Sequence, residues 1–167
     1  MVAKALHCQV NRTNYLDRKN YFYPDLPKGY QITQYTTPIA QDGYLIITDS
    51  AGMEKKIGIE RIQIEEDTGK SVHEGKSSLI NLNRCGTPLL EIVGKPDIAN
   101  AKEASQYFKK LHSILTYLEI TSVNLQEGNL RCDVNLSLKL KNASQLGTRT
   151  EVKNLNSGRI KFLWHDL

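Results

Sequence analysis

The chain has 167 residues, of which 40% are hydrophobic and 24% are charged. This composition excludes an intrinsically disordered chain, and the length is enough for one ordinary domain with a hydrophobic core. The formal net charge of +4 permits an anionic partner such as ATP or RNA without requiring one. No apolar run approaches the ~20 residues of a membrane span, so no membrane partner is expected.

Three cysteines, Cys8, Cys85 and Cys132, are an odd number and lack CxxC spacing. They predict reduced thiols and argue against both a disulfide framework and a zinc knuckle. The first ten residues also lack the composition of a secretory signal or a transit peptide.

The first 30 residues predict the end of a helix running into an extended segment over residues 1–10, followed by an ordered loop. Residues 17–30 form this loop, because Pro24 and Pro27 exclude a regular helix. Its four aromatic side chains would pin the loop to the body, which is the preferred interpretation. In the alternative, three cations of the loop face an anion: Arg18, Lys19 and Lys28.

Residues 41–66 predict two strands, each preceded by a turn. Gln41-Asp42-Gly43 is a turn signal before a strand over residues 44–47, and Ala51-Gly52 is another before a strand over residues 55–65. In the second strand Ile57 and Ile59 share one parity, whereas Ile62 and Ile64 share the other. A bulge near Glu60-Arg61 is therefore expected.

Residues 65–93 contain the carboxylates of greatest interest. The cluster Glu65-Glu66-Asp67 precedes a GKS sequence that is not a P-loop, because Ile64 stands where that motif needs glycine. A tight turn with Gly69 at positive φ is expected instead, with a loop between the glycines at 69 and 75 and a strand over residues 78–83. Glu91 then lies inside an apolar strand over residues 88–93, where a carboxylate must be paired or bound to a cation.

One strong helix follows, with Asn100 as its N-cap and Glu103 at the capping-box position. A shorter helix is expected over residues 158–164. The apolar stripe of the strong helix is core packing: Ala104, Tyr107, Phe108, Leu111, Ile114, Leu115 and Leu118.

Two late segments alternate as strands do. Residues 148–155 place three charged side chains on one face: Arg149, Glu151 and Lys153. Residues 130–140 form the other strand. Its apolar face comprises Leu130, Cys132, Val134, Leu136, Leu138 and Leu140, and its polar face Arg131, Asp133, Asn135, Ser137 and Lys139. A solvated sheet face is one explanation of this charge. A surface that holds a metal–phosphate complex is the other, because each strand places a carboxylate between cations.

These side chains suit magnesium and phosphate chemistry. Hard carboxylate oxygens favour Mg²⁺ over zinc, and cations offset charge on a transferring phosphoryl group. The candidate acids are Glu66, Glu91, Asp133 and Glu151. The candidate cations are Lys19, Lys28, Arg131, Arg149 and Lys153. The expected architecture is an α+β domain, mostly antiparallel sheet with a packed helix.

Five segments resemble the B subunit of the tRNA-dependent glutamyl-tRNA(Gln)/aspartyl-tRNA(Asn) amidotransferase family, in order along nearly the whole chain. They are Asp17–Gln34, Glu65–Ser71, Leu82–Val93, Glu127–Asn135 and Gly147–Ser157. The resemblance implies a cradle domain with the glutamine synthetase/guanido kinase fold. It implies that ATP and Mg²⁺ serve to phosphorylate the side chain of tRNA-bound glutamate. Ammonia from the partner amidase (the A subunit) then displaces phosphate to form Gln-tRNA(Gln), and a small third protein (the C subunit) is the other member of the heterotrimer.

Carried over by motif, Glu66 and Glu91 correspond to metal-associated acids, and Arg131 and Asp133 are expected to join them in the catalytic set. The residues expected to line the phosphate site or the ammonia path are Lys19, Lys28, Thr87, Arg149, Glu151 and Lys153.

Departures from the family pattern give further expectations. The chain is expected to be a partial cradle domain over residues 1–167, lacking an N-terminal Glu-x-His pair and the helical and tail domains. Gln63 and the sequence around it favour a mitochondrial setting, or a cytoplasmic one if the source is bacterial. A non-catalytic or degenerate scaffold that binds the amidase or tRNA is the alternative function.

Overall fold

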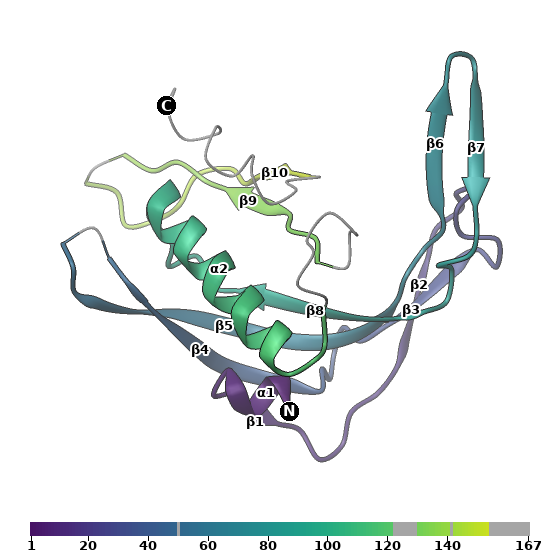
Figure 1. The fold of residues 1–167 in the computed structure, drawn as a ribbon. Helices are drawn as coiled ribbons and strands as arrows, with labels where there is room; N and C mark the ends of the chain where they lie inside the picture. Colours follow the sequence, from purple (N-terminus) through teal and green to yellow (C-terminus); the bar gives the residue numbers. More distant parts are fainter. Residues whose placement is uncertain (50, 122–129, 141, 154–167) are drawn as a thin grey trace. The chain divides into compact units, whose positions relative to one another are not determined.

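The computed structural model describes residues 1–49, 51–121, 130–140 and 142–153 of the 167 (Figure 1). The chain forms two compact units. The first comprises Met1–Leu45 and Lys56–Asp97, and the second comprises Ile46–Lys55 and Ile98–Leu167. The described strand registers are antiparallel, and one long helix accompanies the strands. The predicted α+β class is therefore confirmed.

A four-stranded sheet holds the core of the first unit, in the order β1-β4-β5-β8. Its strands are β1 (Gln9–Val10), β4 (Ala40–Thr48), β5 (Glu54–Glu66) and β8 (Pro88–Gly94). Helix α1 (Val2–Ala5) precedes β1, so the predicted helix end running into an extended segment is confirmed. The β5 register against β8 shifts between Ile59 and Arg61, which confirms the predicted bulge. This shift lets Ile57, Ile59 and Ile62 all be fully buried despite their change of parity.

The turn predicted at residues 41–43 is wrong, because β4 runs through it. Asp42 does adopt a positive φ of 53°, so the sequence signal reflects a real local distortion. The adjacent Gly43 is required by packing. A Cβ there would lie 2.2 Å from Cys8 Sγ and 2.4 Å from the Leu6 carbonyl oxygen.

Residues 17–33 form a hairpin where a loop was predicted. Strands β2 (Asp17–Asn20) and β3 (Tyr30–Thr33) pair antiparallel on either side of the two prolines. Of its apolar side chains, Leu26 is buried, whereas Phe22 is 90% exposed. Leu26 is therefore an anchor of this segment, and the expectation that all four aromatic side chains anchor it is wrong, because Tyr23 is also 59% exposed.

A second hairpin replaces the loop predicted between the glycines at 69 and 75. It consists of β6 (Lys70–Glu74) and β7 (Ser77–Asn81), with Gly75 at a φ of +60° in the turn. The expected positive φ at Gly69 is wrong. Gly69 is needed for close packing, because a Cβ there would lie 2.9 Å from Leu82 Cδ2 and 3.0 Å from the Asn81 carbonyl oxygen.

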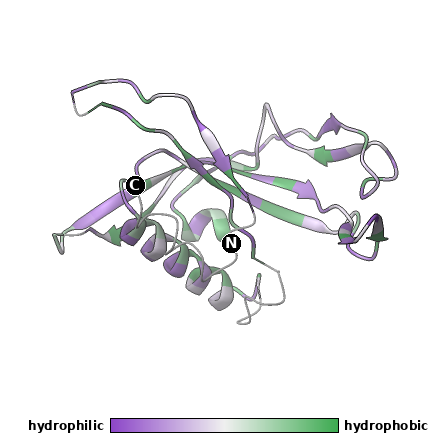
Figure 2. Cartoon of the chain, turned by 90° about the horizontal axis from the view of Figure 1, so that it is seen from above, coloured by the Kyte–Doolittle hydropathy of each residue, from purple (hydrophilic) through white to green (hydrophobic). Residues whose placement is uncertain are grey.

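The second unit packs helix α2 (Ala101–Tyr117) on the pair β9 (Val134–Leu136) and β10 (Thr150–Val152). Figure 2 shows apolar and polar bands alternating along α2, as the predicted stripe requires. Phe108 is the buried centre of this packing. The side chains packed against it are Ala104, Leu130, Cys132, Val134 and Val152.

The predicted strand over residues 130–140 is shorter in the structure than in the prediction. Only residues 134–136 are paired, and Leu138 and Leu140 are 76% and 82% exposed. The alternation of apolar and polar residues continues beyond residue 136 in the sequence. Among the described residues no strand pairs with that part, so its apolar side chains stay exposed. The helix predicted over residues 158–164 lies outside the described residues. Within the described part, no helix is both long and apolar enough to span a membrane.

The N-terminus of α2 is capped as predicted. The Asn100 side chain accepts a hydrogen bond from the Glu103 backbone N–H at 3.0 Å. The buried Glu103 carboxylate accepts from the Ala99 N–H at 2.9 Å and from Lys55 Nζ at 2.8 Å. Burial alone would raise the pKa of Glu103, but these hydrogen bonds and the Lys55 charge together lower it.

Glu103 therefore gives an expected pH dependence. A pKa lowered by folding contributes stability that is present above the unfolded value of about 4.3 and is lost as pH falls through the folded value. We expect Glu103→Gln to lower the free energy of unfolding by about 1–3 kcal/mol at pH 7, with the deficit shrinking as pH falls below about 4.3. Denaturant titrations across this range measure it, with the exposed Glu54→Gln as control. A deficit that stays constant with pH would contradict the assignment.

Candidate functional site

Two carboxyl groups meet on one face of the first unit's sheet. Gln63 of β5 lies directly opposite Glu91 of β8, and Glu65 is two residues further along β5 on the same face. Gln63 Nε2 donates to Glu91 Oε2 at 2.9 Å and to Glu65 Oε1 at 2.8 Å. The two carboxyl groups also share a hydrogen bond. Glu91 is therefore paired with Glu65, which explains how the apolar run accommodates it.

The pKa values of the two carboxyl groups shift in opposite directions. Burial raises the pKa of Glu91 to about 7, together with its hydrogen bond to Glu65 and the Glu65 charge, while Arg61 and Lys19 act in the opposite direction. Burial also tends to raise the pKa of Glu65, but hydrogen bonds from Thr33, Glu91 and Gln63 lower it overall. Near neutral pH Glu65 is thus ionised and Glu91 is titrating. Such a pair is a suitable place for a cation.

Glu66 faces a different set of partners. Its Oε2 pairs with Lys28 Nζ and accepts from the Ile32 backbone N–H at 3.0 Å. The Lys28 hydrogen bond and the Ile32 N–H lower the pKa of Glu66. Lys28 also lies 4.7 Å from the centre of the Tyr30 ring. A cation of residues 17–30 does face an anion here, and that anion is a side chain of the same chain.

The predicted metal acids, Glu66 and Glu91, are not direct neighbours along the ladder. Glu66 pairs with Pro88, three positions from Glu91, which corresponds to ~10 Å along a strand. The described residues contain no group of three His, Cys, Asp or Glu side chains that could hold a metal ion. The carboxyl pair fits the mode that Mg²⁺ prefers, with one or two carboxylates supplemented by water and substrate phosphates.

Thr87 takes part in a turn that supports the site. Its hydroxyl donates to the Arg84 carbonyl at 2.8 Å, and its own carbonyl accepts from the Asp67 N–H at 2.8 Å. Arg84 Nε in turn pairs with the buried Asp67 carboxylate at 3.0 Å. These contacts fix the start of β8, which carries Glu91. A role for Thr87 in lining an ammonia path stays a prediction.

The remaining predicted residues lie on the second unit. Glu151 of β10 is opposite Asn135 of β9, which places Glu151 on the polar face, as the alternation predicted. Lys153 Nζ lies 3.6 Å from Glu151 Oε2. Their use in phosphate binding stays a prediction. All five are exposed: Arg131, Asp133, Arg149, Glu151 and Lys153.

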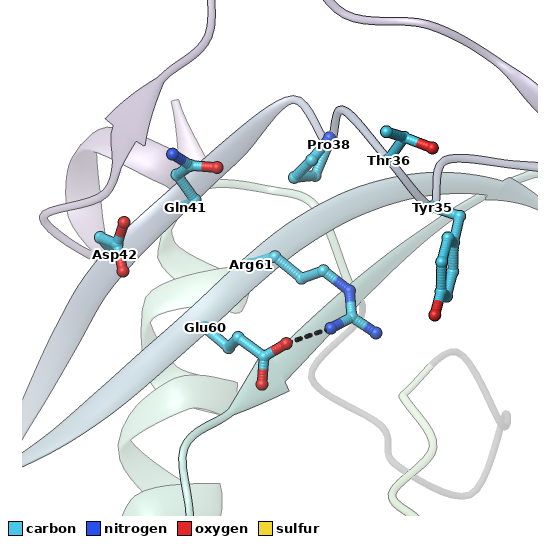
Figure 3. Close-up of a pocket in the computed structure, with 7 residues that line it drawn as sticks. All are labelled: Tyr35, Thr36, Pro38, Gln41, Asp42, Glu60 and Arg61. Carbon is cyan, nitrogen blue, oxygen red and sulfur yellow. Dashed lines mark hydrogen bonds and ion pairs between the residues drawn. The ribbon is translucent and has the colours of Figure 1, made fainter.

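A pocket of about 490 Å³ opens beside the bulge of β5 (Figure 3). Arg61 reaches into it, and its Nη1 pairs with Glu60 Oε1. Arg61 Nε donates to Gln63 Oε1 at 2.8 Å, so the guanidinium connects the pocket wall to the carboxyl pair. The lining residues are Tyr35, Thr36, Pro38, Gln41, Asp42, Glu60 and Arg61.

Three residues of this site were missed from the sequence: Glu65, Gln63 and Arg61. Glu65 belongs to the acidic cluster Glu65-Glu66-Asp67 that the sequence analysis identified. Because residues 63 and 65 are two apart in a strand, the sequence also predicts that they lie on the same face. The missing fact was the register, because only the pairing of Gln63 with Glu91 shows which acid of the cluster meets Glu91.

Comparison with known proteins gives a match to the family model "GatB/GatE catalytic domain" over residues 1–161. The B subunit of the aspartyl/glutamyl-tRNA(Asn/Gln) amidotransferase of Campylobacter curvus is 55% identical over 159 residues, covering 95% of this chain and 33% of that protein. The corresponding protein of Clostridium tetani is 52% identical over 153 residues, covering 92% of this chain and 32% of that protein.

The chain thus spans about a third of the length of these curated relatives. Both relatives are bacterial, so they give the expected mitochondrial setting no support. The match covers both units and includes the strands that carry the carboxyl pair and the charged face. The chain belongs to the GatB/GatE catalytic domain family.

Proposed function

We propose that the chain supplies part of the cradle domain of a tRNA-dependent amidotransferase, in its B subunit, which activates the side-chain carboxylate of glutamate or aspartate esterified to tRNA. The observation that carries the proposal is the carboxyl pair Glu65–Glu91, with the Lys19 charge acting on both groups. Family membership supports the same conclusion, because the relatives are named as aspartyl/glutamyl-tRNA amidotransferase subunits. A glutamine synthetase/guanido kinase type of fold is part of this proposal.

The reaction has two steps. In the first, a carboxylate oxygen of the tRNA-bound side chain attacks the γ-phosphorus of ATP, the bond to the ADP oxygen breaks, and an acyl phosphate forms. In the second, ammonia attacks the acyl carbon, the carbon–oxygen bond to phosphate breaks, and inorganic phosphate leaves, with the lost proton passing to solvent. The partner amidase would supply ammonia from glutamine, and the small third protein would complete the heterotrimer.

The chain's own residues would contribute positioning and charge. Glu65 and Glu91 are the groups that would hold Mg²⁺, which when bound offsets the charge of the ATP phosphates. The family resemblance makes Glu66 a further candidate for metal binding. In the structure its carboxylate forms an ion pair with Lys28. Lys19, close enough to act on the carboxyl pair, would offset charge on the transferring phosphoryl group.

A hybrid protein tests the proposal. In it, the 159-residue segment of the Campylobacter curvus relative that matches this chain is replaced by the corresponding residues of this chain. Assembled with the C. curvus amidase and the small third protein, the hybrid is expected to convert Glu-tRNA(Gln) to Gln-tRNA(Gln) with ATP and glutamine. The unaltered C. curvus complex is the control. A hybrid that assembles and leaves glutaminase activity intact but forms no amide would favour the scaffold alternative and overturn the proposal.

A further inference from the structure

Gln63 is a buried amide at the centre of the carboxyl pair, with 6% of its surface exposed. Its Nε2 makes close hydrogen bonds to Glu65 Oε1 and Glu91 Oε2, at 2.8 and 2.9 Å. Its Oε1 accepts from Arg61 Nε at 2.8 Å. Both N–H groups of the amide are thus directed at carboxyl oxygens, and its carbonyl is directed at a guanidinium.

Arg61 decides which way this amide is oriented. Rotation of a glutamine side-chain amide by half a turn exchanges its oxygen and its NH2 group. In the exchanged orientation two donors would face each other at Arg61, and a carbonyl oxygen would face Glu65 and Glu91. Arginine has donors only, so its Nε–H requires the oxygen of Gln63. Arg61 is itself held by Glu60.

A neutral donor has a specific advantage between two acids. A lysine in this place would neutralise the pair and compete with any cation for its charge. The amide of Gln63 orients both carboxyl groups and adds no charge, so their negative charge stays available. Residues that hydrogen-bond to metal-binding carboxylates commonly change metal affinity or activity by ~10–100-fold when mutated.

We propose that Gln63 is a positioning residue that holds Glu65 and Glu91 together for cation and phosphate binding, with its amide oriented by Arg61. This inference rests on the proposed function. It adds a chain of contacts that starts at Arg61 in the wall of the pocket (Figure 3) and runs through Gln63 to the two acids.

Two substitutions of Gln63 separate positioning from packing. Gln63→Leu keeps a similar volume and removes every hydrogen bond. Gln63→His keeps one acceptor for Arg61 and one N–H donor for the acids in its neutral form. Gln34→Leu is the matched control, because Gln34 is a fully buried glutamine whose contacts are Asn14, Tyr15 and the Ile64 backbone.

The hybrid complex is measured for kcat of amide formation, and for the Kd of Mn²⁺ used alone as a magnetic probe. Gln63→Leu is expected to lower kcat and raise the Mn²⁺ Kd, each by ~10–100-fold. Gln63→His is expected to recover both to within about fivefold of the parent. Gln34→Leu is expected to lower Tm with kcat and Kd within about twofold of the parent. Parental kcat and Kd in Gln63→Leu, or no recovery in Gln63→His, would overturn the proposal.

Arg61→Leu provides a second measurement at a side chain that is less buried than Gln63, so a packing defect is less of a concern. It is expected to lower kcat by ~3–10-fold alone and to have no further effect when combined with Gln63→Leu, because both act through one amide. Additive effects would contradict the contact chain. An inactive parent hybrid would refute the proposed function instead, and the Mn²⁺ titrations would still decide the role of Gln63.

Discussion

Replacement of Glu91 by Gln is expected to reduce amide formation by the hybrid complex by on the order of 10²-fold or more. Glu91 is the carboxyl group that the apolar strand β8 holds against Glu65 and Gln63. Glutamine keeps the shape of the side chain and removes its negative charge. The site therefore binds a cation less tightly, and the negative charge of the ATP phosphates is less well offset during transfer. Single-turnover rates of Gln-tRNA(Gln) formation, with ATP in excess, measure the effect.

The control for this prediction is Glu74→Gln, an exposed carboxylate of β6 in the same unit. It is expected to leave the rate within about twofold of the parent, because exposed charges have little effect beyond their neighbours. Glutaminase activity of the partner amidase, measured in the same samples, shows that the complex is assembled. A Glu91→Gln complex that forms amide at the parental rate would remove the carboxyl pair from the mechanism.

Replacement of Phe108 by Ala is expected to destabilise the second unit by about 3–5 kcal/mol, the usual cost of deleting a buried aromatic side chain. Phe108 is 8% exposed and contacts apolar groups from both β9 and β10. Its removal leaves a cavity between α2 and the strand pair that carries the charged face. Hydrogen exchange of peptides from α2, followed by mass spectrometry, measures the loss of stability within this unit.

Tyr117→Ala is the matched control, because Tyr117 is an aromatic residue of the same helix and is 88% exposed. A change within about 0.5 kcal/mol is expected for it. Peptides from β5 and β8 of the first unit serve as the internal reference. Equal protection of α2 in the Phe108→Ala and parent proteins would show that Phe108 does not anchor the strand pair.

The sequence by itself determined several elements of this protein. The α2 helix followed from its apolar stripe and from Asn100 and Glu103, because caps and helical periodicity are local properties. The β5 bulge followed from the parity change after Ile59, because each side chain of a strand must lie on one face or the other. The matching order of five segments also identified the family, and the family model matches residues 1–161.

Local signals failed where a neighbour elsewhere in the chain decided the conformation. The turn signal at Asp42-Gly43 lies inside β4, because Leu6 and Cys8 pack against Gly43. The glycines at 69 and 75 bound a strand of a hairpin, because residues 77–81 supply its partner. Propensity describes what a segment can adopt, whereas pairing with a distant segment decides which of these conformations it adopts.

The candidate site shows the same division. Sequence identified Glu91 as an unusual acid, because a carboxylate in an apolar run needs a partner. Only the tertiary structure decided that the partner is Glu65, and that Glu66 faces Lys28. The reason is the register of β5 against β8. A shift of one residue would turn Gln63 and Glu65 to the opposite face, and nothing within either strand alone specifies that alignment.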